Sequence, residues 1–428
     1  MKYKFNTLAL HAGIQTDETG SRGVPLHRTS AYLFKDTEHA ANLFGLKELG
    51  NIYSRIQNPT QDVLEQRVAA LEGGAASLAL ASGTSAVFYT IINVCGSGDE
   101  VVSTSNLYGG TFTMFSTILP ELGITVRMVP PDNSDAIHAA VNQNTRLLFT
   151  ETIGNPSLDV ANIRAMADIA DEHHIPLVVD STFTTPYLIR PIEHGAHMVV
   201  HSLTKWMGGH GTGIGGVVVD SGTFDWTDDK FRLFNEPDRS YHDLRYAHDL
   251  GDLNPLAFIM RMRLVPLRNL GACISPDNAW MFLQGIETLG LRMREHCKNA
   301  FETARFLSTH DQVSWVRYPG LESDPSHKTA REQFENGYGG MVVFGLKAGR
   351  KGGECFINSL QLLSHLANVG DAKSLAIHPA STTHSQLTEE ELESAGVTAD
   401  MVRLSIGIED IEDIINDIDH GLSACRLI

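Results

Sequence analysis

Between residues 61 and 220, short runs of apolar and β-branched residues alternate with longer stretches that carry apolar side chains at helical spacing. The short runs are ASLALAS, EVVSTS, TVRMVP, TRLLFTET, IPLVVDS, HMVVHS and GIGGVVVDS. Continuous apolar strands that alternate with helices are typical of a mostly parallel sheet with helices on both faces. The sequence therefore predicts an α/β fold for this part of the chain.

The pattern changes before and after this alternating region. Residues 1–60 have weak periodicity and many turn-forming residues, so we expect an N-terminal arm rather than a layer of the core. The large domain is predicted over 61–265. A long helical stretch over 275–309, then the short runs GGMVVFGLK and MVRLSIGI, indicate a smaller C-terminal α+β domain over 266–428.

Charge and composition limit the classes of partner. The chain has 428 residues, of which 42% are hydrophobic and 20% are charged, as expected of a soluble globular protein. Its formal net charge of −18 argues against nucleic acid and anionic membranes as partners. A membrane span is not expected, because the sequence lacks an apolar run of about 18 residues.

The cysteines and histidines point to a reducing compartment and give little support for a metal. The five cysteines are scattered and form no C-x-x-C pair, which is typical of a cytoplasmic protein. His194, His197 and His201 are close in sequence, but no acidic or thiol ligand accompanies them. Because zinc sites usually combine such ligands at regular spacings, we predict no metal site.

Polar side chains follow the predicted strands at the edge where ligands bind in open α/β sheets, beyond the carboxyl ends of the strands. In chain order they are Ser82, Gly83, Thr84, Tyr108, Asn155, Asp180, Ser202, Thr204 and Lys205. An anion cradle, an aromatic ring, an amide, a carboxylate and an amine are thus expected along one rim. Each feature alone is weak evidence, whereas the set indicates a binding site.

One group of these residues suits a phosphate. Ser82 precedes a predicted helix, and the free N–H groups and dipole of a helix N-terminus favour an anion. The hydroxyls of Ser202 and Thr204 can donate further hydrogen bonds to the same anion. The sequence therefore predicts a phosphate subsite at this turn.

The other group suits the aromatic aldehyde of pyridoxal phosphate. Tyr108 can stack on the pyridine ring, and Asp180 can keep the ring nitrogen protonated, which makes the ring an electron sink. Lys205 can condense with the aldehyde, and a desolvated lysine with a lowered pKa is also a usable base. These three residues are the predicted catalytic residues.

The same residues can also be explained by ordinary structural roles, and one glycine-rich stretch suggests a different cofactor. An aspartate at the end of a strand is often a turn former, and a lysine between two hydroxyls is usually at the surface. The stretch GTGIGG, residues 211–216, satisfies the G-x-G-x-x-G spacing of dinucleotide-binding turns. A strand-like run rather than a helix follows it, so the context argues against a nicotinamide cofactor.

At HSLTKW, VVDSTF and ETIGNPS the sequence resembles the Cys/Met-metabolism family of pyridoxal phosphate enzymes, which have the aspartate-aminotransferase-like fold (fold type I). The resemblance covers nearly the whole chain. It implies pyridoxal 5'-phosphate as cofactor. Through SRIQNPT it implies that Tyr53 and Arg55 reach the cofactor phosphate of a neighbouring subunit. Through MVRLSIGIED it implies that Arg403 binds the substrate α-carboxylate. Asn155, Asn368 and Tyr53 are expected as further substrate-binding residues.

Within the family, KWMGGHGT and the segment 367–384 are most similar to the O-acetylhomoserine sulfhydrylase branch, because the γ-synthase and lyase branches tend to carry serine where Asn368 stands. This branch implies γ-replacement in methionine biosynthesis: O-acetylhomoserine and sulfide, or another thiol, give homocysteine and acetate. Shared active sites imply a dimer, expected to assemble into a homotetramer. The alternatives are a methionine γ-lyase, a cystathionine γ-synthase or lyase, and a non-catalytic binding protein that keeps the cofactor fold.

Overall fold

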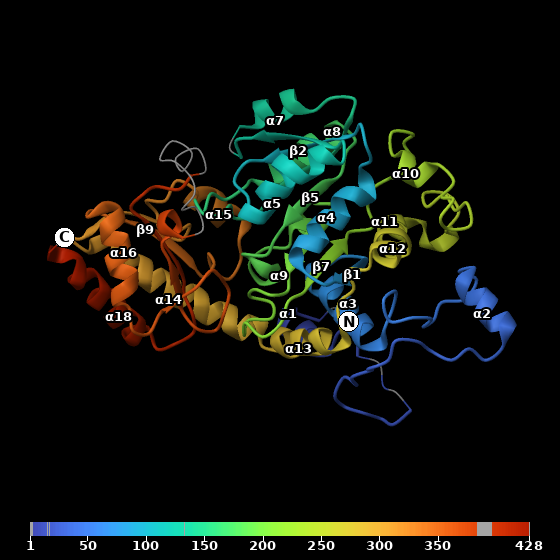
Figure 1. Cartoon of the computed structure of the whole chain (residues 1–428), viewed down its shortest axis with the longest axis horizontal. Coiled ribbons are helices and arrows are strands. Elements are labelled where there is room, and N and C mark those ends of the chain that lie inside the picture. The colour runs from blue at the N-terminus through green and yellow to red at the C-terminus, as the bar shows by residue number, and fades with distance from the viewer. Residues whose placement is uncertain (1–2, 15, 17, 132, 383–395, 428) are drawn as a thin grey trace.

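The computed structural model describes residues 3–14, 16, 18–131, 133–382 and 396–427. In these residues, seven strands form a large sheet in the order β1-β7-β6-β5-β4-β2-β3 (Figure 1). The strands are β1 (Ala76–Leu80), β2 (Glu100–Thr104), β3 (Thr125–Val129), β4 (Thr145–Glu151), β5 (Leu177–Asp180), β6 (Met198–Ser202) and β7 (Gly216–Asp220). Each lies in one of the predicted apolar runs.

The large sheet is mixed, with one reversed strand. Strands β2 to β6 run parallel to one another, whereas β7 pairs antiparallel with both β1 and β6. β7 lies between β1 and β6 in the sheet although it follows β6 directly in the chain. The α/β architecture with a mostly parallel sheet is therefore confirmed, and β7 is the strand whose direction the apolar run alone did not reveal.

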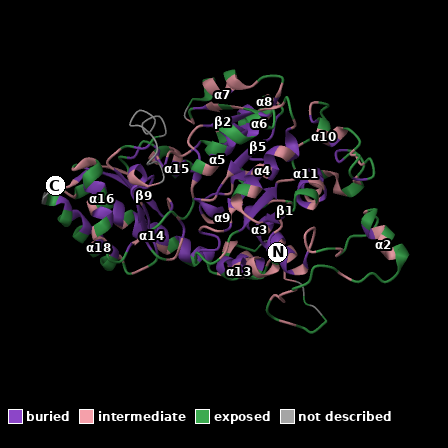
Figure 2. Cartoon of the chain, viewed as in Figure 1, coloured by how far each residue is buried: buried purple, intermediate pink, exposed green. Residues whose placement is uncertain are grey.

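Helices cover both faces of this sheet, and neighbouring residues of one strand face opposite layers. Val179 packs in the same core as Leu64 of α3 (Pro59–Glu72), while Val178 packs with Ile91 of α4 (Gly83–Val94). Both faces are buried, which explains the continuous apolar runs in the sequence (Figure 2).

The other helices around the large sheet are α5 (Gly109–Thr113), α6 (Leu119–Glu121), α7 (Ser134–Ala140), α8 (Ile163–Glu172), α9 (Thr185–Leu188), α10 (Arg232–Asn235), α11 (Ala257–Met262) and α12 (Arg268–Leu270). Local sequence sets the ends of the longer helices. At α3, the Asn58 side chain accepts a hydrogen bond from the Thr60 N–H at 2.9 Å, and Pro59 fills the first helical position. Gly73 ends α3 with φ +76°, a left-handed conformation that glycine adopts without a side-chain clash.

A second, smaller sheet carries the C-terminal part of the chain. Among the described residues, five strands run in the order β10-β11-β12-β9-β8. They are β8 (Val313–Arg317), β9 (Met341–Leu346), β10 (Ser364–His365), β11 (Leu375–Ile377) and β12 (Met401–Ser405). Helices α14 (Leu289–Thr309), α15 (His327–Gln333), α16 (Gly349–Ser359) and α18 (Ile411–Ala424) accompany this sheet. Ile414, Ile418 and Leu422, on one side of α18, pack into its core.

The predicted helical stretch over 275–309 consists of two helices, α13 (Pro276–Glu287) and α14, which meet at Thr288. Phe282 and Leu283 of α13 pack into the core beneath the large sheet, while Ala300 and Ala304 of α14 pack into the core of the small sheet. The chain thus passes from one core to the other along α14. The domain limits of 61–265 and 266–428 stay a prediction.

Ahead of α3, the described residues up to 58 contain two short helices, α1 (Phe5–His11) and α2 (Thr37–Phe44), and are otherwise mostly turns and irregular chain. Ala9 of α1 is buried in the core of the large domain, so this helix is a packed element rather than part of a free arm. α2 lies away from the large sheet (Figure 1). In the part of the chain that the structure describes, no helix is both long and apolar enough to cross a membrane.

Gly216, at the start of β7, lies very close to the backbone at the first turn of α4. A Cβ atom there would overlap the carbonyl oxygen of Ser82 and lie 2.7 Å from the backbone nitrogen of Gly83. Because both neighbours are backbone atoms, we expect Gly216→Ala to destabilise the cofactor-free protein by about 1–3 kcal/mol, measured from urea unfolding. Gly23→Ala is the control, since nothing lies within 4 Å of its added Cβ. Equal stability of the two variants would contradict this account.

Candidate functional site

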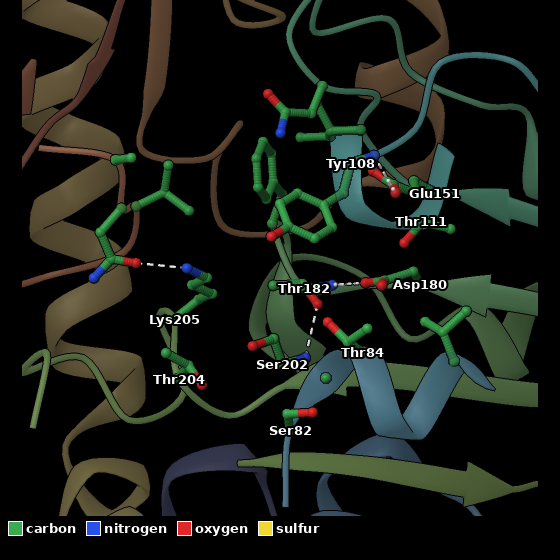
Figure 3. A pocket seen from close by; sticks show the side chains of 18 of the residues that line it. Ser82, Thr84, Tyr108, Thr111, Glu151, Asp180, Thr182, Ser202, Thr204 and Lys205 are labelled. Atoms are coloured by element: carbon green, nitrogen blue, oxygen red, sulfur yellow. Dashed lines mark hydrogen bonds between the residues drawn. The ribbon is translucent and has the colours of Figure 1, made fainter. Parts of the chain in front are cut away.

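A cavity of about 230 Å³ lies at the carboxyl ends of the parallel strands and is closed on one side by the C-terminal part of the chain (Figure 3). The predicted residues that line it are Ser82, Gly83, Thr84, Tyr108, Asn155, Asp180, Ser202, Thr204, Lys205, Asn368 and Arg403. Glu151, Thr182, Thr111, Phe183 and Ile214 are among the lining residues that the sequence analysis did not select. The structure thus brings residues from the predicted rim, β12 and the loop around Asn368 to one place.

The N-terminus of α4 forms one end of the cavity. Ser82 is its N-cap, and its hydroxyl accepts a hydrogen bond from the Ser85 N–H at 3.0 Å. The N–H groups of Gly83 and Thr84 belong to the first turn, where no preceding turn can accept them. An added Cβ on Gly83 would lie 2.6 Å from the Cβ of Ser202, so a glycine is needed for β6 and α4 to approach this closely. This turn is a cradle suited to an anion.

Hydroxyl groups from β6 and the loop after β5 surround the same end. The Ser202 N–H donates to the Thr182 hydroxyl at 2.8 Å, which fixes the end of β6 beside β5. The Thr204 hydroxyl accepts a hydrogen bond from the Gly215 N–H at 3.1 Å. Ser202, Thr182, Thr204 and Thr84 therefore line this end of the cavity (Figure 3).

Lys205 stands on the side of the cavity formed by the C-terminal part of the chain. Its ammonium donates a hydrogen bond to the Asn368 amide oxygen at 2.5 Å. Burial, and secondly the charge of Arg403, lower the pKa of Lys205 from 10.5 to about 8. A sizeable fraction of this lysine is therefore the neutral amine near neutral pH, the form that acts as a nucleophile or base.

Arg403, on β12, is held in a defined orientation. Its guanidinium donates a hydrogen bond to the Asn155 amide oxygen at 2.9 Å. Burial lowers the pKa of Arg403 to about 10, so it remains a cation at neutral pH. A buried guanidinium that opens into a cavity can bind a carboxylate through two parallel hydrogen bonds.

Asp180, at the end of β5, lies across the cavity from Lys205 (Figure 3). Burial raises its pKa, while hydrogen bonds from Thr182 and the charge of His201 oppose the rise. The Thr182 N–H donates to the Asp180 carboxylate at 2.9 Å. A buried carboxylate of this kind can hold a protonated ring nitrogen as an ion pair.

Tyr108 precedes α5, lines the cavity and is 51% exposed as a residue. Its backbone N–H donates a hydrogen bond to the Glu151 carboxyl at 2.7 Å. The ring is thus free to stack on a planar ligand that lies between Lys205 and Asp180. The anion cradle, ring, amine and carboxylate are placed as pyridoxal phosphate requires, and the residues present fit this cofactor.

Tyr53 and Arg55 do not line the cavity of their own chain. The Arg55 guanidinium stacks on the Tyr53 ring at 5.0 Å. Their predicted role, in the site of a neighbouring subunit, stays a prediction. Among the described residues, no cluster of three histidine, cysteine or acidic side chains could hold a metal ion. His201 instead bonds Glu72 at 2.5 Å behind the sheet.

Glu151 and Thr182 were missed by the sequence analysis. Glu151 ends the apolar run TRLLFTE in the same way that Asp180 ends LVVD, and the two residues are register partners of β4 and β5. The repeated pattern of a buried strand that ends in an acid was the available signal. Thr182 follows Asp180 by two residues, the spacing at which a backbone N–H commonly bonds an aspartate side chain.

Comparisons with known proteins agree with this geometry. A model of the family described as Cys/Met metabolism PLP-dependent enzyme matches residues 6–423. The chain belongs to this family. The pyridoxal phosphate cofactor and the α/β fold predicted from the sequence are thereby confirmed.

Relatives across the family match along almost the whole chain. The O-acetyl-L-homoserine sulfhydrylase of Leptospira meyeri is 51% identical over 427 residues, which covers 98% of this chain and 97% of that protein. The homocysteine synthase of Schizosaccharomyces pombe is 49% identical over 422 residues, or 98% of each.

A solved structure of a family member has the same fold. It is a putative O-acetylhomoserine (thiol)-lyase from Campylobacter jejuni, with a TM-score of 0.95 and 41% identity over 98% of this chain and 100% of that chain. That structure carries N'-pyridoxyl-lysine-5'-monophosphate at position 205. The link between a lysine and the cofactor in that relative agrees with the chemistry inferred for Lys205.

The lowered pKa of Lys205 predicts how the cofactor-free protein takes up pyridoxal phosphate. The neutral amine reacts with the aldehyde, so the rate of binding should rise with pH through a midpoint near 8, well below the ordinary lysine value of 10.5. Arg403→Gln removes a cation that disfavours the ammonium, and should move the midpoint upward. Arg403→Lys, which keeps a positive charge, is the control.

The measurement is the stopped-flow growth of visible absorbance between pH 6 and pH 10. A wild-type rate that still rises without a plateau at pH 10, as an ordinary lysine would give, or a downward shift in Arg403→Gln, would show that burial and Arg403 do not set this pKa.

Proposed function

We propose that this chain is an O-acetylhomoserine sulfhydrylase, which converts O-acetylhomoserine and sulfide into homocysteine and acetate for methionine biosynthesis. The observation that carries the proposal is the cavity in which Lys205 and Asp180 face each other, with Arg403 beside Lys205. The relatives described above as O-acetylhomoserine sulfhydrylase and homocysteine synthase, about half identical over the full length, support this choice of reaction.

Each residue has a distinct task in this reaction. When bound, pyridoxal phosphate supplies an aldehyde that links to amines and a ring that withdraws electrons from the adjoining carbons. The cradle at α4 with Ser202 and Thr204 holds the phosphate. Asp180 keeps the proton on the ring nitrogen, and Tyr108 covers one face of the ring. These residues fix the orientation of the reacting carbons.

Substrate binding and proton transfer fall to the other side of the cavity. Arg403, oriented by Asn155, binds the α-carboxylate of the amino acid. Lys205 removes the proton at Cα and returns it, because its lowered pKa makes the neutral amine available. The Cγ–O bond to acetate breaks and a Cγ–S bond to sulfide forms. Asn368 holds the Lys205 nitrogen at 2.5 Å and keeps it on this side of the cavity.

The presence of Asn368 supports assignment to the sulfhydrylases rather than to the lyases and synthases of the family. This amide contacts the Lys205 ammonium directly, so the feature that separates the branches in sequence lies beside the catalytic amine. A methionine γ-lyase would release ammonia and a keto acid, whereas the sulfhydrylase releases acetate and keeps the amino group. A non-catalytic binding protein would bind the cofactor without turnover.

The proposal is tested by incubating purified protein, loaded with pyridoxal phosphate, with O-acetylhomoserine and sulfide. We expect homocysteine and acetate in equal amounts. Lys205→Ala should lower the rate by at least about a thousandfold, because the base that moves the Cα proton is lost. Ammonia and a keto acid as main products would instead indicate a lyase. Protein that binds the cofactor but forms neither product set would indicate a binding protein.

We also propose that the active unit is an oligomer with shared sites, a dimer that assembles into a homotetramer. Tyr53 and Arg55 are outside the cavity of their own chain, and the arm that carries them exposes large apolar side chains. Leu33 is 99% exposed and Leu49 is 66% exposed, which suits burial against a second copy. The five free cysteines suit a reducing cytoplasm, where we propose that the protein acts.

Mixed oligomers test the sharing of sites. Lys205→Ala and Arg55→Ala should each be nearly inactive alone. Subunits of the two variants, unfolded together and refolded, should regain about a quarter of wild-type activity, because half of the dimers are mixed and each has one intact site. The control is each variant refolded with itself. No gain in the mixture would show that Arg55 serves its own chain or no site.

A further inference from the structure

Two acidic side chains meet at the edge of the large sheet beneath the cavity. Glu151 ends β4 and Asp180 ends β5, and the two residues are register partners in the parallel pair. Glu151 is 7% exposed, yet it lines the cavity together with Asp180. The mechanism above uses Asp180 and gives no task to Glu151.

Other buried glutamates next to this sheet have a basic partner. Glu65 pairs with Arg263 at 2.5 Å, and Glu72 pairs with His201 at 2.5 Å. Among the hydrogen bonds and ion pairs of the described residues, none joins Glu151 to a basic side chain. A buried carboxylate without a cation, beside a second carboxylate, is costly, so one of the two carries a proton.

The hydrogen bonds indicate which of the two keeps the negative charge. Asp180 accepts the Thr182 N–H at 2.9 Å, and the charge of His201 also favours its ionised form. Glu151 accepts one hydrogen bond, from the Tyr108 N–H at 2.7 Å. The negative charge therefore belongs to Asp180 and the proton to Glu151. In agreement, burial first and the charge of Asp180 second raise the pKa of Glu151 well above its usual range.

The one bond that Glu151 makes connects it to the residue that covers the cofactor ring. Tyr108 lies just before α5 and is about half exposed as a residue, so its position depends on its backbone. The Glu151 carboxyl holds that backbone over the end of β4 (Figure 3). The other charged side chains that line the cavity are Arg403 and Lys205, and Lys205 lies across the cavity from Asp180 (Figure 3).

We propose that Glu151 is a positioning residue, a neutral carboxylic acid that fixes Tyr108 over the cofactor ring and leaves Asp180 as the one negative charge facing the ring nitrogen. The inference rests on the proposed use of Asp180 and Tyr108. An ionised Glu151 would add a second negative charge beside Asp180 and change the proton affinity of the bound cofactor. A neutral acid supplies the acceptor for the Tyr108 N–H without that change.

The experiment compares Glu151→Gln, Glu151→Leu and wild type, each loaded with pyridoxal phosphate. The first readout is the pH midpoint of the visible absorbance of the bound cofactor. The second is hydrogen–deuterium exchange of the peptide that contains the Tyr108 amide. Asp220→Asn is the matched control, because Asp220 is also a buried acid of this sheet but lies at its opposite edge, beside Met198.

Glutamine keeps an acceptor oxygen and carries no charge. We expect Glu151→Gln to shift the absorbance midpoint by no more than about 0.3 pH unit and to keep the exchange of the Tyr108 peptide at the wild-type rate. Glu151→Leu removes the acceptor, so exchange at this amide should rise about three- to tenfold and the cofactor should dissociate faster. Asp220→Asn should change neither readout.

A midpoint shift of about one pH unit or more in Glu151→Gln would show that Glu151 is ionised, and would overturn the proposal. Unchanged exchange and cofactor release in Glu151→Leu would overturn the positioning role. Glu151→Ala replaces the leucine variant if that protein does not fold. Since neither readout uses O-acetylhomoserine or sulfide, failure here is distinguishable from failure of the proposed reaction.

Discussion

The structure depends on the placement of a buried amine and a buried carboxylate on opposite sides of one cavity. Lys205 lies three residues beyond the end of β6, and Asp180 ends β5, so neighbouring strands deliver the two groups to the same edge of the sheet. Burial disfavours the charged form of each group, so neither charge would be favourable there without a partner. The fold tolerates the pair because Asn368 contacts the amine and Thr182 contacts the carboxylate. The chemistry of the site follows from this arrangement.

The cavity therefore has two electrostatic sides. Arg403 and Lys205 stand together, and the cation of Arg403 pushes the Lys205 pKa further down. Such a pair attracts the α-carboxylate of an amino acid while leaving the Lys205 amine able to accept a proton. On the other side, one negative charge faces the cofactor ring, and a second carboxyl close by need not be charged to hold Tyr108. On each side of the cavity, one group thus binds the substrate or the cofactor, and a neighbouring group can change its protonation state.

Much of this could be predicted from the sequence because buried parallel strands leave a strong pattern. The apolar runs located the strands, and the residues that follow them located Asp180, Lys205 and the turn at Ser82. Arg403, Asn368, Tyr53 and Arg55 came from the family resemblance, since nothing local in their segments states a role. The reversed direction of β7 was not predicted, because a run of valines has the same pattern in either direction.

Glu151 shows why residues that act through others are hard to find in a sequence. It ends a strand as Asp180 does, but its significance lies in a contact with a backbone N–H 43 residues earlier in the chain. No spacing rule connects a carboxyl to the main chain of a distant aromatic residue. The contact becomes visible only when β4 and β5 are seen in register, with two acids side by side and one of them already bonded to Thr182. The register places the two acids side by side, and their different hydrogen bonds are what we infer to leave the charge on Asp180 and the proton on Glu151.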